Sequence, residues 1–212
     1  MTVHDGVMSG QRTMSTVVEI GALDALRDAI YRARHEVYAL EIGQHAANAE
    51  GRLSDALDEA NRYLAVTRAG ELAGFVSITP PGDHGYSIDK YFDRSDLPFQ
   101  LDHSSFEIRL LTVLPKFRRL NIAAVLMLAA FRWIESRGGS QIVAIGRREI
   151  KGIYQKAGLG DAGLSVDAGA VTYDLMHGSV EGIRRQIDRS DHVERIERTV
   201  DWQMTPPLRR PA

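Results

Sequence analysis

The sequence contains no cysteine among its 212 residues. Disulfide bonds, thiolate zinc sites and a cysteine nucleophile are therefore excluded, and we expect a protein of a reducing compartment, the cytoplasm. Residues 1–16 also lack the apolar segment of a secretory signal. We expect these residues to form a flexible N-terminus. The longest apolar stretch, residues 122–131, is about half of the roughly 18 to 20 residues that a membrane-spanning helix needs. It predicts a buried core helix and no membrane association.

A strong charge of either sign is missing as well. The 26 Lys and Arg residues nearly balance the 28 Asp and Glu residues, and the formal net charge is −2. This balance argues against a protein that mainly neutralises a nucleic-acid backbone. The sequence also lacks a G-x-S-x-G elbow, a G-x-x-x-x-G-K-[ST] loop and any metal-ligand spacing of its histidines. We therefore expect neither a metal site nor the usual hydrolase or nucleoside-triphosphatase chemistry.

The hydrophobic pattern predicts one α/β (α+β) domain at residues 17–177, followed by a C-terminal helical extension and tail at 178–212. The expected strands lie at residues 17–20, 63–67, 72–79, 106–113, 142–145 and 171–176, and the expected helices at 23–37, 121–136 and 149–156. An Ala69-Gly70 turn joins the second and third strands into a hairpin. This order predicts a mixed, mostly antiparallel central sheet with helices on its faces.

One strand, residues 106–113, continues through a short basic loop directly into a helix that starts near Asn121. Unpaired N–H groups at a helix start bind anionic phosphate, and the helix dipole reinforces this. Ala123 is small enough to let a pyrophosphate approach the backbone. An ordinary strand–loop–helix connection with two solvated arginines explains these features equally well.

Three residues of this loop carry a family resemblance. Arg118, Asn121 and Ala123 fall on a pattern of Arg or Gln, two variable residues, Gly, one variable residue and Gly or Ala, and the segment resembles the GNAT (N-acetyltransferase) superfamily, which has this signature. Asn121 replaces the middle glycine; asparagine tolerates left-handed backbone and can cap a helix. Residues 151–159 resemble the family's later helix, and residues 171–176 resemble its closing strand.

The N-terminal half adds a looser resemblance. Residues 31–38 and 52–55 are similar to the branch that contains acyl-homoserine-lactone and long-chain N-acyl amino acid synthases. The resemblance as a whole implies a GNAT fold and an N-acyltransferase that moves an acyl group from acetyl-CoA, or another acyl-CoA, to a small-molecule amine by direct attack. It implies that the donor is held by the strand end and the loop, at Leu111, Thr112, Val113, Arg118, Arg119, Leu120, Asn121, Ile122, Ala123 and Ala124.

The resemblance also suggests catalytic residues. Glu107 stands where the histone-acetylating branch carries its general base, although an ion pair with Arg109 is the alternative. Tyr154 matches the tyrosine beside the donor sulfur, which could protonate the leaving thiolate, although it could also serve packing only. If Arg109 does not pair with Glu107, it could hold an acceptor carboxylate. Arg147 and Arg148 replace an asparagine common in relatives and are either a solvated pair or a contact for phosphate or an acidic carrier protein.

Two alternatives stay open at this point. The donor could be acyl-carrier protein or aminoacyl-tRNA instead of CoA, and the near-neutral charge disfavours tRNA without excluding it. The chain could also be a non-catalytic module that binds acyl-CoA or a partner, which would suit the loss of the motif glycine at Asn121. The C-terminal extension could form a homodimer, cover the site or dock another protein.

Overall fold

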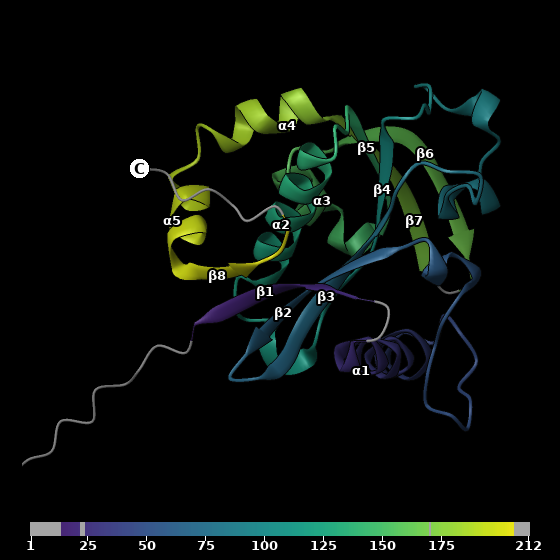
Figure 1. The fold of residues 1–212 in the computed structure, drawn as a ribbon. Coiled ribbons are helices and arrows are strands. Elements are labelled where there is room, and N and C mark those ends of the chain that lie inside the picture. The colour runs from purple at the N-terminus through teal and green to yellow at the C-terminus, as the bar shows by residue number, and fades with distance from the viewer. Residues whose placement is uncertain (1–13, 22–23, 170, 206–212) are drawn as a thin grey trace, which may run out of the picture.

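The computed structural model describes residues 14–21, 24–169 and 171–205. Most of the expected flexible start, 1–16, and the end of the expected tail, 206–212, lie outside the described residues. The described chain is built on one eight-stranded sheet with the order β6-β7-β5-β4-β3-β2-β1-β8 (Figure 1). The strands are β1 (Ser15–Ile20), β2 (Arg62–Arg68), β3 (Glu71–Thr79), β4 (Ser105–Val113), β5 (Gln141–Arg147), β6 (Gly160–Ala168), β7 (Val171–Ser179) and β8 (Val200–Gln203).

Strand neighbours are antiparallel except for two parallel pairs, β4–β5 and β1–β8. The mixed, mostly antiparallel sheet predicted from the sequence is therefore confirmed. The helices are α1 (Ala25–Arg34), α2 (Ile122–Ser136), α3 (Lys151–Lys156), α4 (Val180–Ile187) and α5 (Asp191–Thr199), with a π-helical turn η1 (His35–Glu41) that continues α1. Short 3-10 turns lie at η2 (Ala56–Glu59), η3 (Ser87–Lys90), η4 (Arg94–Asp96), η5 (Pro115–Phe117) and η6 (Arg148–Ile150).

The two faces of the sheet are covered by different helices. Along β2, Tyr63 and Ala65 pack with residues of α1, whereas the alternate residues Leu64 and Val66 pack with α2. This alternation follows from the strand period of two residues. In Figure 1, α1 lies on one side of the sheet, and α2 lies on the other with α3, α4 and α5 around it.

The apolar stretch 122–131 forms most of α2, as expected for a buried core helix. Leu126, Ala129, Ala130 and Ile134 have no exposed surface, because the sheet lies on one side of α2 and the C-terminal helices on the other. Within the described ranges, no helix is both long and apolar enough to span a bilayer.

The predicted hairpin turn is also confirmed. Ala69 and Gly70, between β2 and β3, both have positive φ, at 50° and 78°. Two consecutive residues with positive φ are typical of the turn that matches the twist of a tight β-hairpin.

The strands β4 and β5 separate partway along their length. Their parallel pairing runs from Ser105↔Gln141 to Ile108↔Ala144 and then stops, while β4 continues to Val113. Leu110 has a φ of 55°, which is unusual for a residue other than glycine, and the β3–β4 register shifts between Phe75 and Ser77. Such a bulge bends a strand, and it leaves an opening between β4 and β5.

Two strands were not expected from the sequence. β6 (Gly160–Ala168) forms one edge of the sheet, and β8 (Val200–Gln203) pairs with β1 at the other edge. The C-terminal segment contains the expected helices, α4 and α5, and its apolar residues Val180, Ile183 and Ile196 join the main core. This segment therefore completes both the sheet and the core.

Candidate active site

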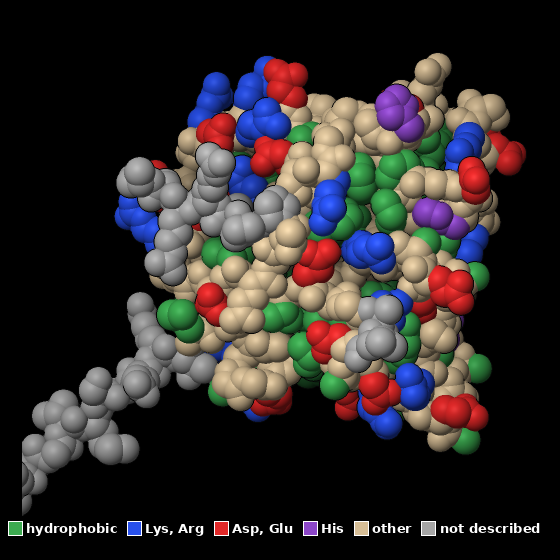
Figure 2. Space-filling view, viewed as in Figure 1, with side chains coloured by type: hydrophobic (Ala, Val, Ile, Leu, Met, Phe, Trp, Pro, Cys, Tyr) green, Lys and Arg blue, Asp and Glu red, His purple; other side chains and the backbone are tan. Residues whose placement is uncertain are grey.

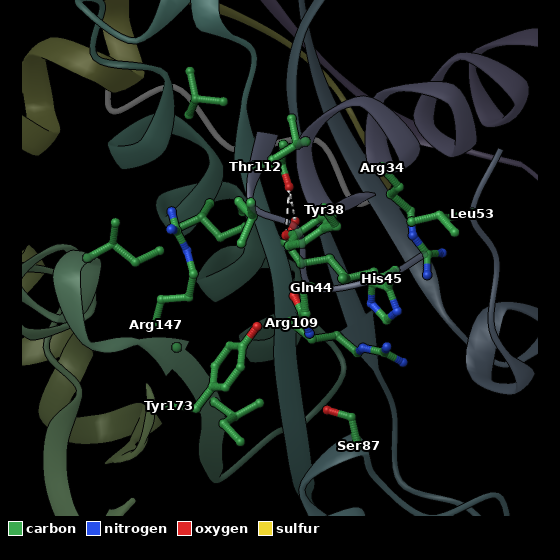
Figure 3. A pocket seen from close by; sticks show the side chains of 18 of the residues that line it. Arg34, Tyr38, Gln44, His45, Leu53, Ser87, Arg109, Thr112, Arg147 and Tyr173 are labelled. Carbon is green, nitrogen blue, oxygen red and sulfur yellow. Dashed lines mark hydrogen bonds between the residues drawn. The ribbon is translucent and has the colours of Figure 1, made fainter. Parts of the chain in front are cut away.

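A cavity of about 480 Å³ lies where β4 and β5 separate (Figure 3). Its walls come from η1, from the loop before η2, from η3 and from the ends of β4, β5 and β7. Eight of the residues predicted for the site line it: Arg109, Leu111, Thr112, Val113, Arg118, Leu120, Ala123 and Tyr154. The other predicted residues, Glu107, Arg119, Asn121, Ile122 and Ala124, do not.

The start of α2 closes one end of this cavity. In the part of the chain that the structure describes, the backbone N–H groups of residues 121–124 donate no backbone hydrogen bond. They therefore keep the free donors that an anionic phosphate requires.

Asn121 takes neither of the roles expected of it. Its φ of −78° lies outside the left-handed region, and its side chain does not cap α2. Its amide nitrogen instead lies 3.0 Å from Nε2 of His192 on α5. Because this position does not require positive φ, losing the motif glycine here causes no backbone strain.

Arg118 is held by an acidic residue in this structure. Its two terminal nitrogens lie 2.7 and 2.6 Å from the carboxylate oxygens of Glu41, and its Nε donates to the carbonyl of Val113 at 3.2 Å. Both charged side chains are more than 40% exposed, at 44% and 43%. Exposed pairs of this kind are weak, so a phosphate could displace Glu41.

Tyr154 lies on the cavity wall, on the short helix α3. It is 2% exposed, and burial raises its pKa, so its phenol stays protonated at neutral pH. No hydrogen-bond partner of its hydroxyl occurs among the described residues. A protonated hydroxyl in the cavity suits a proton donor.

Tyr38 is a cavity residue that the sequence analysis missed. It lies on η1, and its hydroxyl is 2.9 Å from Oγ1 of Thr112 on β4. Since the Thr112 hydroxyl donates to the carbonyl of Leu110 at 3.0 Å, Tyr38 is the donor in its own bond with Thr112. The Tyr38 oxygen can therefore only accept a further hydrogen bond from the cavity.

Glu107 lies behind the cavity wall. It has no exposed surface, and it accepts hydrogen bonds from the backbone N–H groups of Ser87 (2.8 Å) and Ile88 (3.2 Å) and from the Ser87 hydroxyl. Burial raises the pKa of Glu107, although these hydrogen bonds oppose the rise. Ser87 itself lines the cavity, so its hydroxyl connects Glu107 to the cavity.

Arg109 forms an ion pair with Asp55 and not with Glu107. Its terminal nitrogens lie 2.5 and 3.3 Å from the two Asp55 oxygens, and Asp55 also binds Arg34 at 2.9 Å. Burial opposes ionisation of Asp55, but Arg109 and Arg34 hold its pKa below the ordinary value. Both terminal nitrogens of Arg109 are therefore bound to Asp55. The buried Nε of Arg109 has no hydrogen-bond partner among the residues that the structure describes.

The two adjacent arginines at the end of β5 have different surroundings. Arg148 points to the surface and pairs with Asp174 at 2.8 Å. Arg147 is half-buried and lines the cavity beside Tyr173 (Figure 3). Only one of the pair is thus a cavity residue.

A second cavity, of about 370 Å³, lies on the other side of the α2 start. It shares Ala123 and Ile153 with the first cavity, and α4 and α5 supply its outer wall. Its floor is apolar, with Met127 and Phe131, and its rim carries Lys156. Within the described ranges, no group of three or more His, Asp or Glu side chains has the arrangement of a metal site.

The model of the acetyltransferase (GNAT) family matches residues 23–158. The chain therefore belongs to the GNAT family and is an acyltransferase. This confirms the resemblance seen in the sequence. No curated protein sequence matches the chain.

Solved structures share this fold over most of their length. The CoA-dependent acyl-homoserine lactone synthase BjaI, with SAM and isopentyl-CoA, superposes with a TM-score of 0.72 at 17% identity, covering 89% of this chain and 93% of that one. TofI, in a ternary complex with an inhibitor and MTA, gives 0.66 at 17% identity, covering 85% and 99%. FeeM, an N-acyl amino acid synthase from uncultured soil microbes, gives 0.63 at 15% identity, covering 82% and 95%. At this identity the likeness is one of fold.

Proposed function

We propose that this acyltransferase moves an acyl group from a CoA-type thioester to the amine of a small molecule, by direct attack and without a covalent enzyme intermediate. The observation that carries the proposal is the continuous cavity from the α2 start, past the strand end 111–113, to Tyr154. The amine nitrogen attacks the thioester carbonyl, the C–S bond breaks, the amine loses one proton and the thiolate gains one. The products are an amide and a free thiol.

The donor phosphates would lie at the free N–H groups of residues 121–124, with Arg118 and Arg119 beside them. The pantetheine arm would follow β4 into the gap that the bulge opens. There the backbone of Leu111 to Val113 no longer pairs with β5 and can bind the arm and the thioester oxygen.

Tyr154 would donate the proton to the leaving thiolate, because it is protonated and its hydroxyl lies in the cavity. For the proton of the amine we propose Glu107, acting through the Ser87 hydroxyl that it binds. His45 is the competing acceptor. It lines the same cavity, and burial together with the charge of Arg34 lowers its pKa, which keeps the imidazole neutral at pH 7.

Three observations favour CoA over a macromolecular donor. The second cavity adjoins the phosphate-binding helix start, so a nucleotide has room there. In Figure 2, blue and red side chains are interspersed on the face shown, without the broad basic surface that tRNA binding needs. The neighbour BjaI is described as CoA-dependent.

Thioester loss on incubation with a panel of amines tests the proposal. We expect thiol release that depends on the amine, with donor binding only weakly dependent on salt. Tight CoA binding without release for any amine would support a non-catalytic module instead. Steep salt dependence of donor binding would point to tRNA, because each displaced counterion adds to the slope.

A further inference from the structure

The four arginines that line the main cavity differ in whether a carboxylate is bound to them. Arg34 binds Asp55 and Asp58, Arg109 binds Asp55, and Arg118 binds Glu41. Arg147 has no carboxylate partner in the part of the chain that the structure describes. Arg118 holds the pKa of Glu41 below its ordinary value, and the charge of Arg147 adds to this effect without an ion pair between Arg147 and Glu41. A half-buried cation outside any ion pair is stabilised when a ligand supplies a further negative charge.

The surroundings of Arg147 are phenolic. Arg147 and Tyr173 are directly paired across β5 and β7, so their side chains leave the same face of the sheet. Burial raises the pKa of Tyr38, Tyr154 and Tyr173, and the positive charge of Arg147 opposes the rise at each. Arg147 and the three tyrosines line the same cavity, and in Figure 3 the Tyr173 hydroxyl points into it.

Two of these three tyrosine hydroxyls can donate a hydrogen bond to an anionic ligand. Tyr173 and Tyr154 have no hydrogen-bond partner within the described chain, so each can donate to a ligand oxygen, whereas the Tyr38 proton is used by Thr112. A guanidinium and a phenol together match the two oxygens of a carboxylate, and the fork of a guanidinium binds them bidentately.

We propose that Arg147, with the Tyr173 hydroxyl, binds a carboxylate carried by one of the two small-molecule substrates. This inference rests on the proposed acyl transfer. The donor phosphates belong at the α2 start, and the part of CoA that reaches the cavity centre is the uncharged pantetheine and thioester. The carboxylate therefore comes from the acceptor amine or from the acyl group.

The acceptor is the favoured source. Arg109, the residue expected to hold an acceptor carboxylate, has both terminal nitrogens bound to Asp55. Of the four arginines on the cavity wall, Arg147 is the one whose terminal nitrogens form no ion pair or hydrogen bond within the described residues. The assignment thus moves from Arg109 to Arg147.

The test compares Arg147→Gln and Arg147→Lys with Arg148→Gln, a matched control in which the neighbouring arginine is bound to Asp174 outside the cavity. Amino acids are paired with their carboxamides as acceptors, and acetyl-CoA is paired with succinyl-CoA as donors. We expect Arg147→Gln to raise KM for the carboxylate-bearing substrate about 10- to 100-fold, to leave KM for its neutral partner unchanged, and to be partly rescued in Arg147→Lys. Arg148→Gln should behave as wild type.

A selective effect on the acceptor pair would show that the carboxylate belongs to the acceptor. A selective effect on the donor pair would show that it belongs to the acyl group. An equal rise in KM for charged and neutral substrates would overturn the proposal, as would weaker binding of free CoA in Arg147→Gln, which would assign Arg147 to a donor phosphate. Calorimetric binding of amino acids and of succinate in the presence of CoA adds a readout without turnover. Binding that Arg147→Gln abolishes and Arg148→Gln retains would support the site even if wild type transfers no acyl group, whereas equal binding by both variants would reject it.

Discussion

At the scale of single residues, Tyr154 owes its position to a glycine on the neighbouring strand. A Cβ atom at Gly146 would lie 2.5 Å from Cε2 of the Tyr154 ring, closer than atoms can pack. Because Gly146 has no side chain, the Tyr154 ring can pack directly against β5 on the wall of the cavity. The proposed proton donor therefore depends on the strand beside it.

Tyr154→Phe tests this role. We expect kcat for acyl transfer to fall about 100-fold, since general acids contribute roughly 10²–10⁴-fold, while the Kd for CoA stays unchanged because the ring still packs. Steady-state kinetics and calorimetry provide the two values. Tyr91→Phe, at the cavity rim and 38% exposed, is the control. An unchanged kcat in Tyr154→Phe would reduce Tyr154 to a packing residue.

Residues of the site were only partly predictable. The donor loop and the segment 151–159 each lie within a short sequence window, so Arg118 and Ala123 could be matched to one motif and Tyr154 to the other. Tyr38 could not, because its partner Thr112 is 74 positions away and only the folded sheet brings them together. The different surroundings of Arg147 and Arg148 are equally non-local, because they depend on β7.

At the scale of elements, a buried charge network ties α1 to η2 and β2. Arg34 binds both oxygens of Asp58 at 2.8 Å, and each side chain is 6% exposed; Arg34 also donates to the Tyr63 hydroxyl at 2.9 Å. A buried pair is costly to break, because the remaining charge stays buried without its partner.

We therefore expect Asp58→Ala to lower the free energy of unfolding by about 3 kcal/mol, measured by denaturant titration. Asp28→Ala breaks two exposed pairs, with Arg32 on the same helix and with Arg52, and should leave stability near the wild-type value. Equal effects of the two variants would show that the buried network contributes no more than a surface pair.

The Glu41–Arg118 contact joins η1 to the donor loop. If donor phosphate must displace Glu41, then Glu41→Gln should bind CoA about two- to fivefold more tightly, as expected for an exposed pair. Calorimetry at low and high salt measures this, and the gain should shrink at high salt. Weaker CoA binding in Glu41→Gln would mean that Glu41 positions Arg118 for the donor.

Element prediction succeeded where the apolar stretch was long, as in α2, or where apolar and polar residues alternated, as at the start of β4. The edge strand β6 was missed although Ala162, Leu164 and Val166 alternate with polar residues or glycine, because an edge strand is half-exposed and its apolar residues are few. β8 has four residues, which is too short for an alternation of apolar and polar residues to be recognised. Its parallel partner, β1, lies about 185 positions away in the sequence.

At the scale of the whole molecule, the C-terminal segment is part of the core. Ile196 on α5 is 5% exposed and packs with the α2 cluster. Ile196→Ala should cost about 2–4 kcal/mol of unfolding free energy, because it leaves a cavity under α5. Chemical denaturation measures the loss, with the exposed Glu194→Ala as control. A loss below about 0.5 kcal/mol would show that α5 does not belong to the cooperative unit.

The central claim, transfer of an acyl group from CoA to an amine, is tested most directly by mass spectrometry of the reaction products. The wild-type protein is incubated with acetyl-CoA and a panel of amines, each with and without a carboxylate. We expect an N-acylated amine and free CoA in equal amounts, and about 100-fold slower formation of both with Tyr154→Phe. Free CoA without any acylated amine, or acyl groups found covalently on the protein, would contradict it.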